Sequence, residues 1–183
     1  TKSHFRFGLI TPGAIAGGNC VILKPSELAP ASAKTIATYL PRYLDRDSYQ
    51  VVCGGVQETT HLLKIQFDYI FFTGSTSVGK IVHQAASKFL TPVTLELGGK
   101  SPVFVDDTVD IVTTARRILW GKCLNAGQTC IAPDYLLCSK NVEERLIEAA
   151  KTILDEIYGE GVKVSPYFRK IVSESHYKLL KGM

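Results

Sequence analysis

Short apolar runs of the strand type alternate along this chain with longer stretches whose apolar residues recur at helical spacing. Apolar runs bounded by glycine, proline or polar clusters predict strands at residues 20–23, 49–53, 69–72, 93–97, 102–105 and 135–138. Apolar positions three or four residues apart predict helices at residues 28–44, 58–64, 78–88, 111–120, 142–158 and 173–183. This alternation predicts βαβ units and a largely parallel sheet, which is an α/β fold.

Several of these helices carry local signals for their ends or their buried face. Pro41 should kink or end the helix at 28–44, because proline has no amide hydrogen. Asp110 is a plausible N-cap for the helix at 111–120. The helix at 78–88 is expected to bury one face, made of Ile81, Val82, Ala85 and Phe89.

A pair of glycines, Gly98 and Gly99, separates two strand-type runs and is the best candidate for a boundary between two lobes. We therefore expect two domains, at residues 1–97 and 98–183. The first twelve residues show no clear cap or strand, and the final helical stretch has no evident packing partner. We expect the sequence to be a piece of a longer protein or the product of a truncated gene.

The composition is that of a soluble globular protein, with 183 residues, 45% of them hydrophobic and 21% charged. The formal net charge of +4 is modest and is not gathered in blocks, which argues against a dedicated nucleic-acid-binding protein but leaves small anionic ligands open. No apolar run reaches the roughly 18 residues of a transmembrane helix, and no cleavable signal is evident. Membrane association through segments outside this sequence stays open.

The five cysteines form no CxxC pair and no Cys/His metal spacing, and the four histidines are scattered. We therefore expect no metal site and no disulfide framework. An odd number of free thiols in a chain of this size indicates a reducing, intracellular compartment. Cys20, Cys53 and Cys138 lie in apolar runs and are expected to be buried structural residues, while Cys123 follows a helix and is ambiguous.

Cys130 differs from the other cysteines because its flanks, Asn125 to Thr129, are small and polar. A nucleophilic cysteine reacts as the thiolate, which nearby backbone N–H groups can favour. Gly127 would let the backbone turn sharply and approach a substrate. A buried structural cysteine is the alternative, and for an isolated cysteine it is the commoner case.

Glu96 stands within an otherwise apolar strand-type run. A buried carboxylate is costly unless it is hydrogen-bonded or protonated, and such a group can act as a general base. The alternative is a glutamate that faces water, since Thr94 and Glu96 would share one face of the strand.

The turn from Gly74 to Gly79 has a GxxxxG spacing and leads from a strand into a helix, whose first N–H groups could hold a phosphate. Ser75 and Lys80 add donors. The turn matches neither the Walker A nor the GxGxxG pattern, so an ordinary strand–helix turn is the stronger alternative.

Lys24 and Glu27 follow the first strand, where they could bind ribose hydroxyls. The alternative is a helix-capping arrangement with Ser26 as the N-cap.

Taken together, these segments resemble the aldehyde dehydrogenase superfamily in their order and spacing, from Gly13 onward. The matching segments are Ile22 to Glu27, Phe72 to Lys80, Leu95 to Pro102 and Gly127 to Cys130. Residues 91–94 and 131–135 resemble its class 3 and fatty-aldehyde branch.

The resemblance implies the later part of a Rossmann-like cofactor domain, residues 1–97, followed by the start of an α/β catalytic domain, residues 98–183. It implies NAD or NADP as cofactor, a small-molecule aldehyde as substrate, and a homodimer at full length. Cys130 matches the family nucleophile and Glu96 its general base. Lys24 and Glu27 match residues around the adenosine ribose. The positions that match the pyrophosphate side of the cofactor site are Gly74, Ser75, Val78 and Gly79.

The implied chemistry is thiolate attack on the aldehyde, hydride transfer to the nicotinamide and hydrolysis of the thioester. The family stabilises the oxyanion with the nucleophile's backbone N–H and an asparagine amide, but residues 1–12 contain no asparagine. The later glutamate–phenylalanine motif is also absent, so we expect these residues alone to be inactive. Two alternatives stay open: a non-catalytic family member that acts as a binding protein, and a relative that passes the acyl group to phosphate or coenzyme A.

Overall fold

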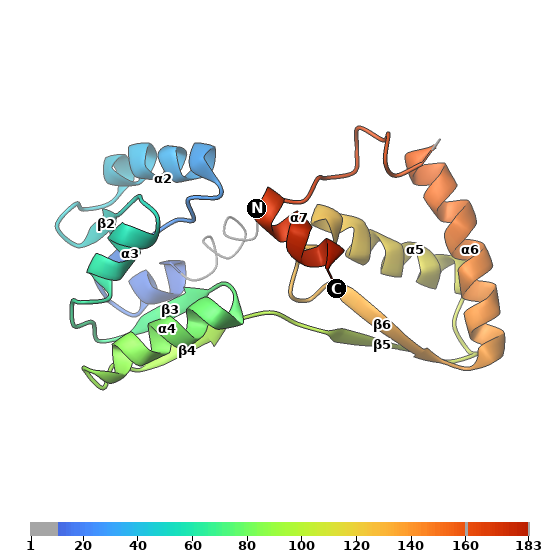
Figure 1. Cartoon of the computed structure of the whole chain (residues 1–183), viewed down its shortest axis with the longest axis horizontal. Helices are drawn as coiled ribbons and strands as arrows, with labels where there is room; N and C mark the ends of the chain where they lie inside the picture. The colour runs from blue at the N-terminus through green and yellow to red at the C-terminus, as the bar shows by residue number, and fades with distance from the viewer. Residues whose placement is uncertain (1–10, 160, 183) are drawn as a thin grey trace. The chain divides into compact units, whose positions relative to one another are not determined.

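The computed structural model describes residues 11–159 and 161–182. The chain divides into two compact units, Thr1–Leu97 and Gly98–Met183, and the division falls at the Gly98-Gly99 pair. Each unit is described by itself, with elements labelled as in Figure 1.

The first unit is built from two strand–helix–strand repeats joined by a short helix. In chain order its elements are β1 (Val21–Leu23), α2 (Pro30–Tyr43), β2 (Tyr49–Val51), α3 (Val56–Leu62), β3 (Ile70–Thr73), α4 (Thr76–Ser87) and β4 (Val93–Glu96). Strand β1 pairs in parallel with β2, and β3 pairs in parallel with β4. The register of the second pair places Thr73 opposite Glu96 at the carboxyl ends of their strands.

The second unit repeats this plan once and adds two helices. Its elements are β5 (Ser101–Val105), α5 (Ile111–Cys123), the 3₁₀ turn η1 (Leu124–Gly127), β6 (Pro133–Cys138), α6 (Lys140–Tyr158) and α7 (Glu174–Lys181). Strands β5 and β6 are parallel. Its core joins β5, α5 and α6 through Val105, Ile111, Ala115, Val142, Leu146 and Ile153.

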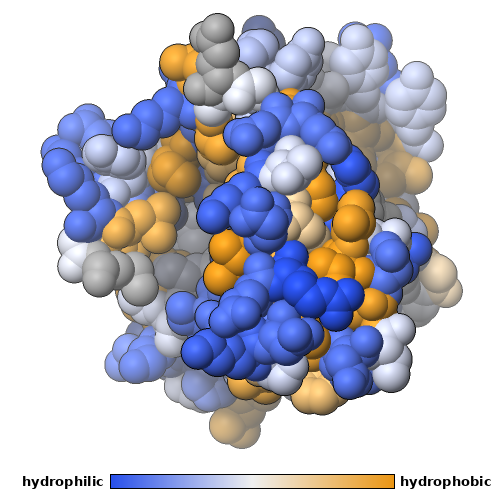
Figure 2. Space-filling model, turned by 90° about the vertical axis from the view of Figure 1, so that its right-hand side faces the viewer, coloured by the Kyte–Doolittle hydropathy of each residue, from blue (hydrophilic) through white to orange (hydrophobic). Residues whose placement is uncertain are grey.

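Helix α6 shows how the pattern of apolar positions sets this core. Val142, Leu146 and Ile153 lie on one stripe of the helix and are buried. The face of the molecule on which α6 lies is largely hydrophilic, with apolar side chains visible between the polar ones (Figure 2). The helix is thus amphipathic, and its apolar stripe packs on α5.

The predicted α/β class and the parallel strand pairing are confirmed. The single, largely parallel sheet that was predicted is not found among the described residues, whose strands form separate two-stranded sheets. Each pair joins two strands that are consecutive along the chain, with α2, α4 or α5 in the connection. Parallel neighbours need such a crossover.

Helix α2 differs from the prediction at both ends. It begins at Pro30, after Ala29 as N-cap without a side-chain hydrogen bond, so Ser26 is not the cap. The oxygen Oγ of Ser26 instead accepts from the N–H of Leu28, at 3.3 Å. The helix also continues through Pro41 to Tyr43. Proline removes one donor, and this close to the end of a helix one missing hydrogen bond does not stop it.

The buried face of α4 was predicted correctly for Val82 and incorrectly for Ile81, and the Asp110 cap of α5 is confirmed. Gly79, Val82 and Ala86 are buried in α4, while Ile81 is 59% exposed. Hydrophobicity favoured Ile81, but the small size of Gly79 lets that side of the helix come closest to the strand. The N–H of Thr113 donates to Asp110 Oδ1 at 2.8 Å.

Candidate active site

In the first unit, the turn between β3 and α4 is held by its own serine and by the neighbouring strand. Ser75 is the N-cap of α4, and its Oγ accepts from the N–H of Val78 at 3.3 Å. The N–H of Gly74 donates to the carbonyl of Glu96 at 3.0 Å. An α-helix leaves its first N–H groups without intrahelical acceptors. The start of α4 is therefore suited to bind an anionic group such as a phosphate.

Gly79 brings α4 close to the end of β4. A Cβ at this position would lie 2.8 Å from Cδ2 of Leu97, which is closer than ordinary packing allows. The absence of a side chain thus sets the distance between the helix and the strand end. Together with the Gly74 turn, this close packing fits the backbone geometry that a bound dinucleotide needs.

Glu96 is the last residue of β4 and is partly buried, as are all four residues of that strand. Its neighbour in the register is Thr73, whose Oγ1 is buried and has no hydrogen-bond partner. The structure therefore places the candidate base at the carboxyl edge of the β3–β4 pair, next to the turn that begins α4.

Lys24 and Glu27, which follow β1, form an ion pair with an Nζ to Oε2 distance of 2.9 Å. The hydrogen bond from Lys24 lowers the pKa of the Glu27 carboxyl. The Lys24 side chain is 21% exposed and that of Glu27 is 49% exposed. A cationic donor beside a carboxylate acceptor fits the two hydroxyls of a ribose.

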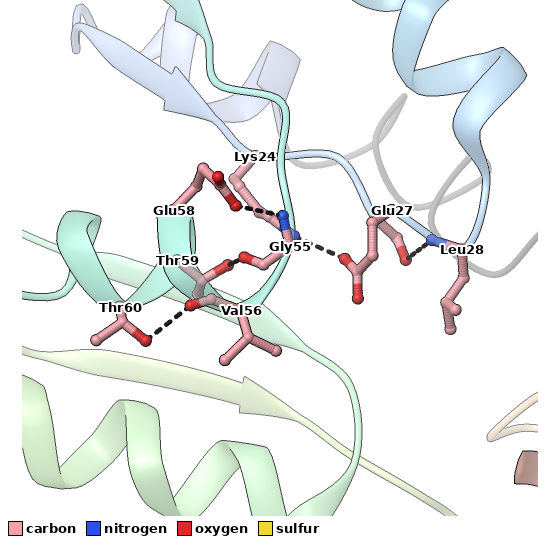
Figure 3. A network of polar contacts seen from close by, with 9 residues as sticks. Lys24, Glu27, Leu28, Gly55, Val56, Glu58, Thr59 and Thr60 are labelled. Carbon is pink, nitrogen blue, oxygen red and sulfur yellow. Dashed lines mark hydrogen bonds and ion pairs between the residues drawn. The ribbon is translucent and has the colours of Figure 1, made fainter.

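A hydrogen bond between Gly55 and Glu58, at the start of α3, was not predicted from the sequence. The N–H of Gly55 donates to Glu58 Oε2 at 2.7 Å. The carboxyl accepts from its own backbone N–H and from Gly55, which lowers the pKa of Glu58; the charge of Lys24 contributes less. Figure 3 shows the Lys24–Glu27 pair beside this hydrogen bond. A pattern of Gly-x-x-Glu at the start of a short helix is the signal that could have predicted it.

In the second unit, Cys130 follows a turn with an unusual backbone. Asn125, Ala126 and Gly127 all have left-handed conformations, with φ of 56°, 55° and 72°. Such a conformation costs a non-glycine residue roughly 1–2 kcal/mol. Two such residues in succession persist only where surrounding contacts hold them, and strained backbone of this kind gathers at functional sites.

The carbonyl of Cys130 is held by the chain that enters β5. The hydroxyl of Ser101 donates to this carbonyl at 3.3 Å. Gly99 lies so close to the same oxygen that a Cβ there would overlap it. Gly99 and Ser101 therefore fix the backbone of the candidate nucleophile from one side. The sequence did not predict this contact.

An ion-pair cluster lies around Asp134, near the start of β6. Its carboxylate oxygens lie 3.0 Å from Lys100 Nζ and 3.7 Å from Lys122 Nζ. The hydrogen bond from Lys100 lowers the pKa of Asp134. This cluster ties together the entry to β5, the end of α5 and the start of β6. No local pattern in the sequence predicts this cluster.

The other cysteines correct one expectation. All five cysteines are free thiols; Cys20 and Cys53 are exposed, while Cys123, Cys130 and Cys138 are partly buried. Buried structural roles for Cys20 and Cys53 are therefore wrong. Both flank short strands rather than lying within them, so the apolar runs around them do not enclose their side chains.

The candidate residues fall in both units. The first holds Glu96, the Gly74–Gly79 turn with Val78, and the Lys24–Glu27 pair; the second holds Cys130. Among residues 11–159 and 161–182, no group of three or more His, Cys, Asp or Glu side chains is arranged to hold a metal ion. No helix within the same ranges is both long and apolar enough to span a membrane.

Comparison with protein families matches residues 8–182 to the aldehyde dehydrogenase family. Among curated proteins, aldehyde dehydrogenase family 3 member B1 of Rattus norvegicus is 54% identical over 93% of this chain and 36% of its own length. The dimeric NADP-preferring aldehyde dehydrogenase of Canis lupus familiaris is 51% identical over 93% and 38% of the respective chains. The chain thus spans little more than a third of these relatives.

Solved structures give the same result. A substrate-bound AldH of Staphylococcus aureus matches with a TM-score of 0.83 and 49% identity, over 93% of this chain and 37% of that one. An aldehyde dehydrogenase of Mycobacterium tuberculosis complexed with NAD+ matches with a TM-score of 0.76 and 27% identity, over 88% and 34% of the respective chains. Relatives of this chain therefore include one solved in complex with NAD+ and one named as NADP-preferring.

Proposed function

Because this chain belongs to the aldehyde dehydrogenase family, we propose that the protein oxidises aldehydes to carboxylic acids with NAD or NADP, through a thioester on Cys130. The observation that carries the proposal is the backbone around Cys130. A turn with successive left-handed residues precedes the thiol, while Gly99 and Ser101 hold its carbonyl. A purely structural cysteine does not need so much support, whereas a nucleophile needs a fixed direction of attack.

In this reaction, the Cys130 thiolate attacks the carbonyl carbon of the aldehyde and forms a tetrahedral adduct. The backbone N–H of Cys130 is a candidate donor to the oxyanion, as in other acyl-transfer sites. Collapse of the adduct leaves an acyl group on the sulfur, and water then releases it as the carboxylic acid.

Glu96 is the proposed general base for that water. It lies at the end of β4, and only Leu97 and Gly98 separate it in sequence from Gly99. Its place at the carboxyl edge of the β3–β4 pair, opposite Thr73, supports this assignment.

The first unit is the proposed cofactor-binding part. The turn of Gly74, Ser75, Val78 and Gly79 would hold the pyrophosphate, and Lys24 with Glu27 would hold the adenosine ribose. The anion-binding start of α4, the close packing at Gly79 and the donor–acceptor pair after β1 support this assignment. NAD or NADP, when bound, accepts the hydride that leaves the adduct.

The similarity to family 3 members supports an aldehyde substrate of the class 3 or fatty-aldehyde type. A relative named as a dimeric enzyme supports a homodimer. Five free thiols agree with a reducing, intracellular compartment. The division of the chain at Gly98 supports separate cofactor-binding and catalytic parts.

The test uses the native protein that carries this sequence, a medium-chain aldehyde, and either NAD or NADP, with reduced cofactor followed by absorbance. Cys130→Ser should abolish turnover, while Cys20→Ser, at an exposed thiol, should keep it. Glu96→Gln should leave the first burst of reduced cofactor and slow the steady state by about 10²–10⁴-fold. The control is Glu144→Gln, on the exposed side of α6.

Analysis of the product separates the alternatives. A free carboxylic acid supports hydrolysis, while an acyl phosphate or acyl-coenzyme A would assign the protein to an acyl-transferring reaction. Turnover that survives Cys130→Ser would contradict the proposed nucleophile.

A further inference from the structure

The side chain of Gln128 connects the turn before Cys130 with a segment more than forty residues later in the chain. Its Nε2 donates to the carbonyl of Asn125 at 2.9 Å and to the carbonyl of Lys170 at 3.3 Å. Its Oε1 accepts from the N–H of Val172 at 2.9 Å. The side-chain amide of Gln128 thus bonds to the backbone of the turn and to the backbone of residues 170–172, and both its nitrogen and its oxygen take part.

Backbone bonds within the turn add to this link. The N–H of Gln128 donates to the carbonyl of Asn125 at 3.1 Å, and Nδ2 of Asn125 donates back to the carbonyl of Gln128 at 3.3 Å. The carbonyl of Asn125 therefore accepts from both the backbone and the side chain of Gln128. These bonds close around Ala126 and Gly127, which are two of the residues with left-handed backbone.

We propose that Gln128 is a positioning residue for Cys130, which holds the left-handed turn against residues 170–172 and so fixes the direction of the thiol. The proposal rests on the role of Cys130 in the proposed function. The side chain of Gln128 bonds to backbone groups and acts on Cys130, two residues later, through the backbone of the turn.

The geometry explains why this position suits glutamine. A carboxylate could accept from Val172 but could not donate to the carbonyls of Asn125 and Lys170. A hydrocarbon side chain of the same length would leave all of these backbone groups without this partner. The segment at 170–172, which has no regular secondary structure, thereby becomes part of the support of the site.

The experiment compares Gln128→Met with the wild type and with Gln66→Met, a control at an exposed position in the loop before β3. In the native protein, limited iodoacetamide labelling with mass mapping gives the ratio of Cys130 to Cys138 labelling. Hydrogen exchange reports the amide of Val172. In the native protein, kcat and KM are measured with an aldehyde and NAD or NADP.

Gln128→Met should speed exchange at Val172 and raise the Cys130 to Cys138 labelling ratio severalfold, because the turn opens. It should lower kcat by about 10–10²-fold with little change in KM, as expected when a reacting group is misplaced by about 1 Å. Gln66→Met should change none of these values. A role in stability alone would lower the melting temperature and leave the labelling ratio and kcat of the folded protein unchanged, which would overturn the proposal.

Far-UV circular dichroism checks that the variants fold. If Gln128→Met does not fold, the same measurements are made on Gln128→Glu. This variant keeps the acceptor for the N–H of Val172 and loses the two hydrogen bonds that Nε2 donates. A native protein without aldehyde oxidation would refute the proposed function. The labelling ratio would still decide whether Gln128 positions the thiol.

Discussion

The two units hold their candidate residues in different ways. In the first, Ser75 and Gly79 belong to a regular strand–turn–helix connection, and Glu96 ends the paired strand. In the second, Cys130 follows an irregular turn whose backbone is strained and is held by Gly99, Ser101 and Gln128. A site built from regular elements needs few special contacts, whereas a strained one depends on each contact that holds it.

This difference suits the parts that we assign to the two units. Binding of a phosphate or ribose tolerates small displacements, because the binding free energy is distributed over several weak hydrogen bonds. Attack by a thiol on a carbonyl does not, since reacting atoms must meet within a narrow range of distance and direction. Substitutions that disturb the second unit should therefore cost more than matched substitutions in the first.

The largest effect is expected from Gly99→Ala, set against Gly98→Ala. A Cβ at Gly99 would overlap the carbonyl oxygen of Cys130, while at Gly98 it would meet nothing within 4 Å. Since the obstacle is backbone, Gly99→Ala should destabilise by about 3 kcal/mol or more, at the upper end of overpacking costs. Thermal unfolding of both variants and labelling of Cys130 test this. Equal melting temperatures would show that the turn is not held as tightly as the structure indicates.

The next largest effect is expected at the helix N-caps, where one serine in each unit can be replaced by alanine. Ser75→Ala should destabilise by about 1 kcal/mol, because Ser75 Oγ caps α4. Ser139→Ala, at the start of α6, removes a similar bond, which is 3.4 Å long. Only Ser75→Ala should also weaken NAD(P) binding to the native protein, as measured by cofactor fluorescence. Equal weakening of NAD(P) binding by both variants would show that the start of α4 is not part of the cofactor site.

A smaller effect is expected from Gly79→Ala, although Gly79 is also tightly packed. Its obstacle is the end of the Leu97 side chain, which can move, and alanine improves helix stability by about 1 kcal/mol. The net change in the free energy of unfolding should therefore stay within about 1 kcal/mol. In a Leu97→Ala background, which frees the space, the same substitution should be clearly stabilising. A large loss in both backgrounds would mean that the backbone of α4 cannot accept a side chain here.

The contrast between the units also explains what the sequence could predict. The strands, the helices and the Asp110 cap follow from periodicity and from neighbours in the chain. The turn at Gly74 and Ser75 was predictable for the same reason. The link between Gln128 and Val172 was not, because nothing in a local pattern states which distant carbonyl or amide a side chain will meet.

Burial shows the same limit. Cys20 and Cys53 were expected to be buried because their neighbours are apolar, yet both are exposed. Ile81 was expected on the buried face of α4, which instead uses Gly79. An apolar run predicts that a strand or helix exists, but which residues are covered depends on how closely another element can approach.

The smallest effect concerns the surface ion pairs, Lys24–Glu27 in the first unit and Lys100–Asp134 in the second. Each lysine lowers the pKa of its carboxyl through a hydrogen bond, so each pair stabilises the folded protein above the carboxyl's ordinary pKa. That contribution is lost as the pH falls below about 4, through the lowered folded-state pKa. Lys24→Met and Lys100→Met should therefore lower the melting temperature slightly at pH 6, and the difference from the wild type should shrink as the pH falls toward 2. Both differences should shrink in high salt, because these side chains are partly exposed and screened. Melting curves from pH 2 to 6 test the sign of this pH dependence.

The same two variants also test the contrast between the units. For Lys100→Met, labelling of Cys130 should change at pH 6, because Asp134 joins the segments around the turn. Lys24→Met should leave the labelling of Cys130 unchanged. A labelling change for Lys24→Met and none for Lys100→Met would reverse the comparison between the two units.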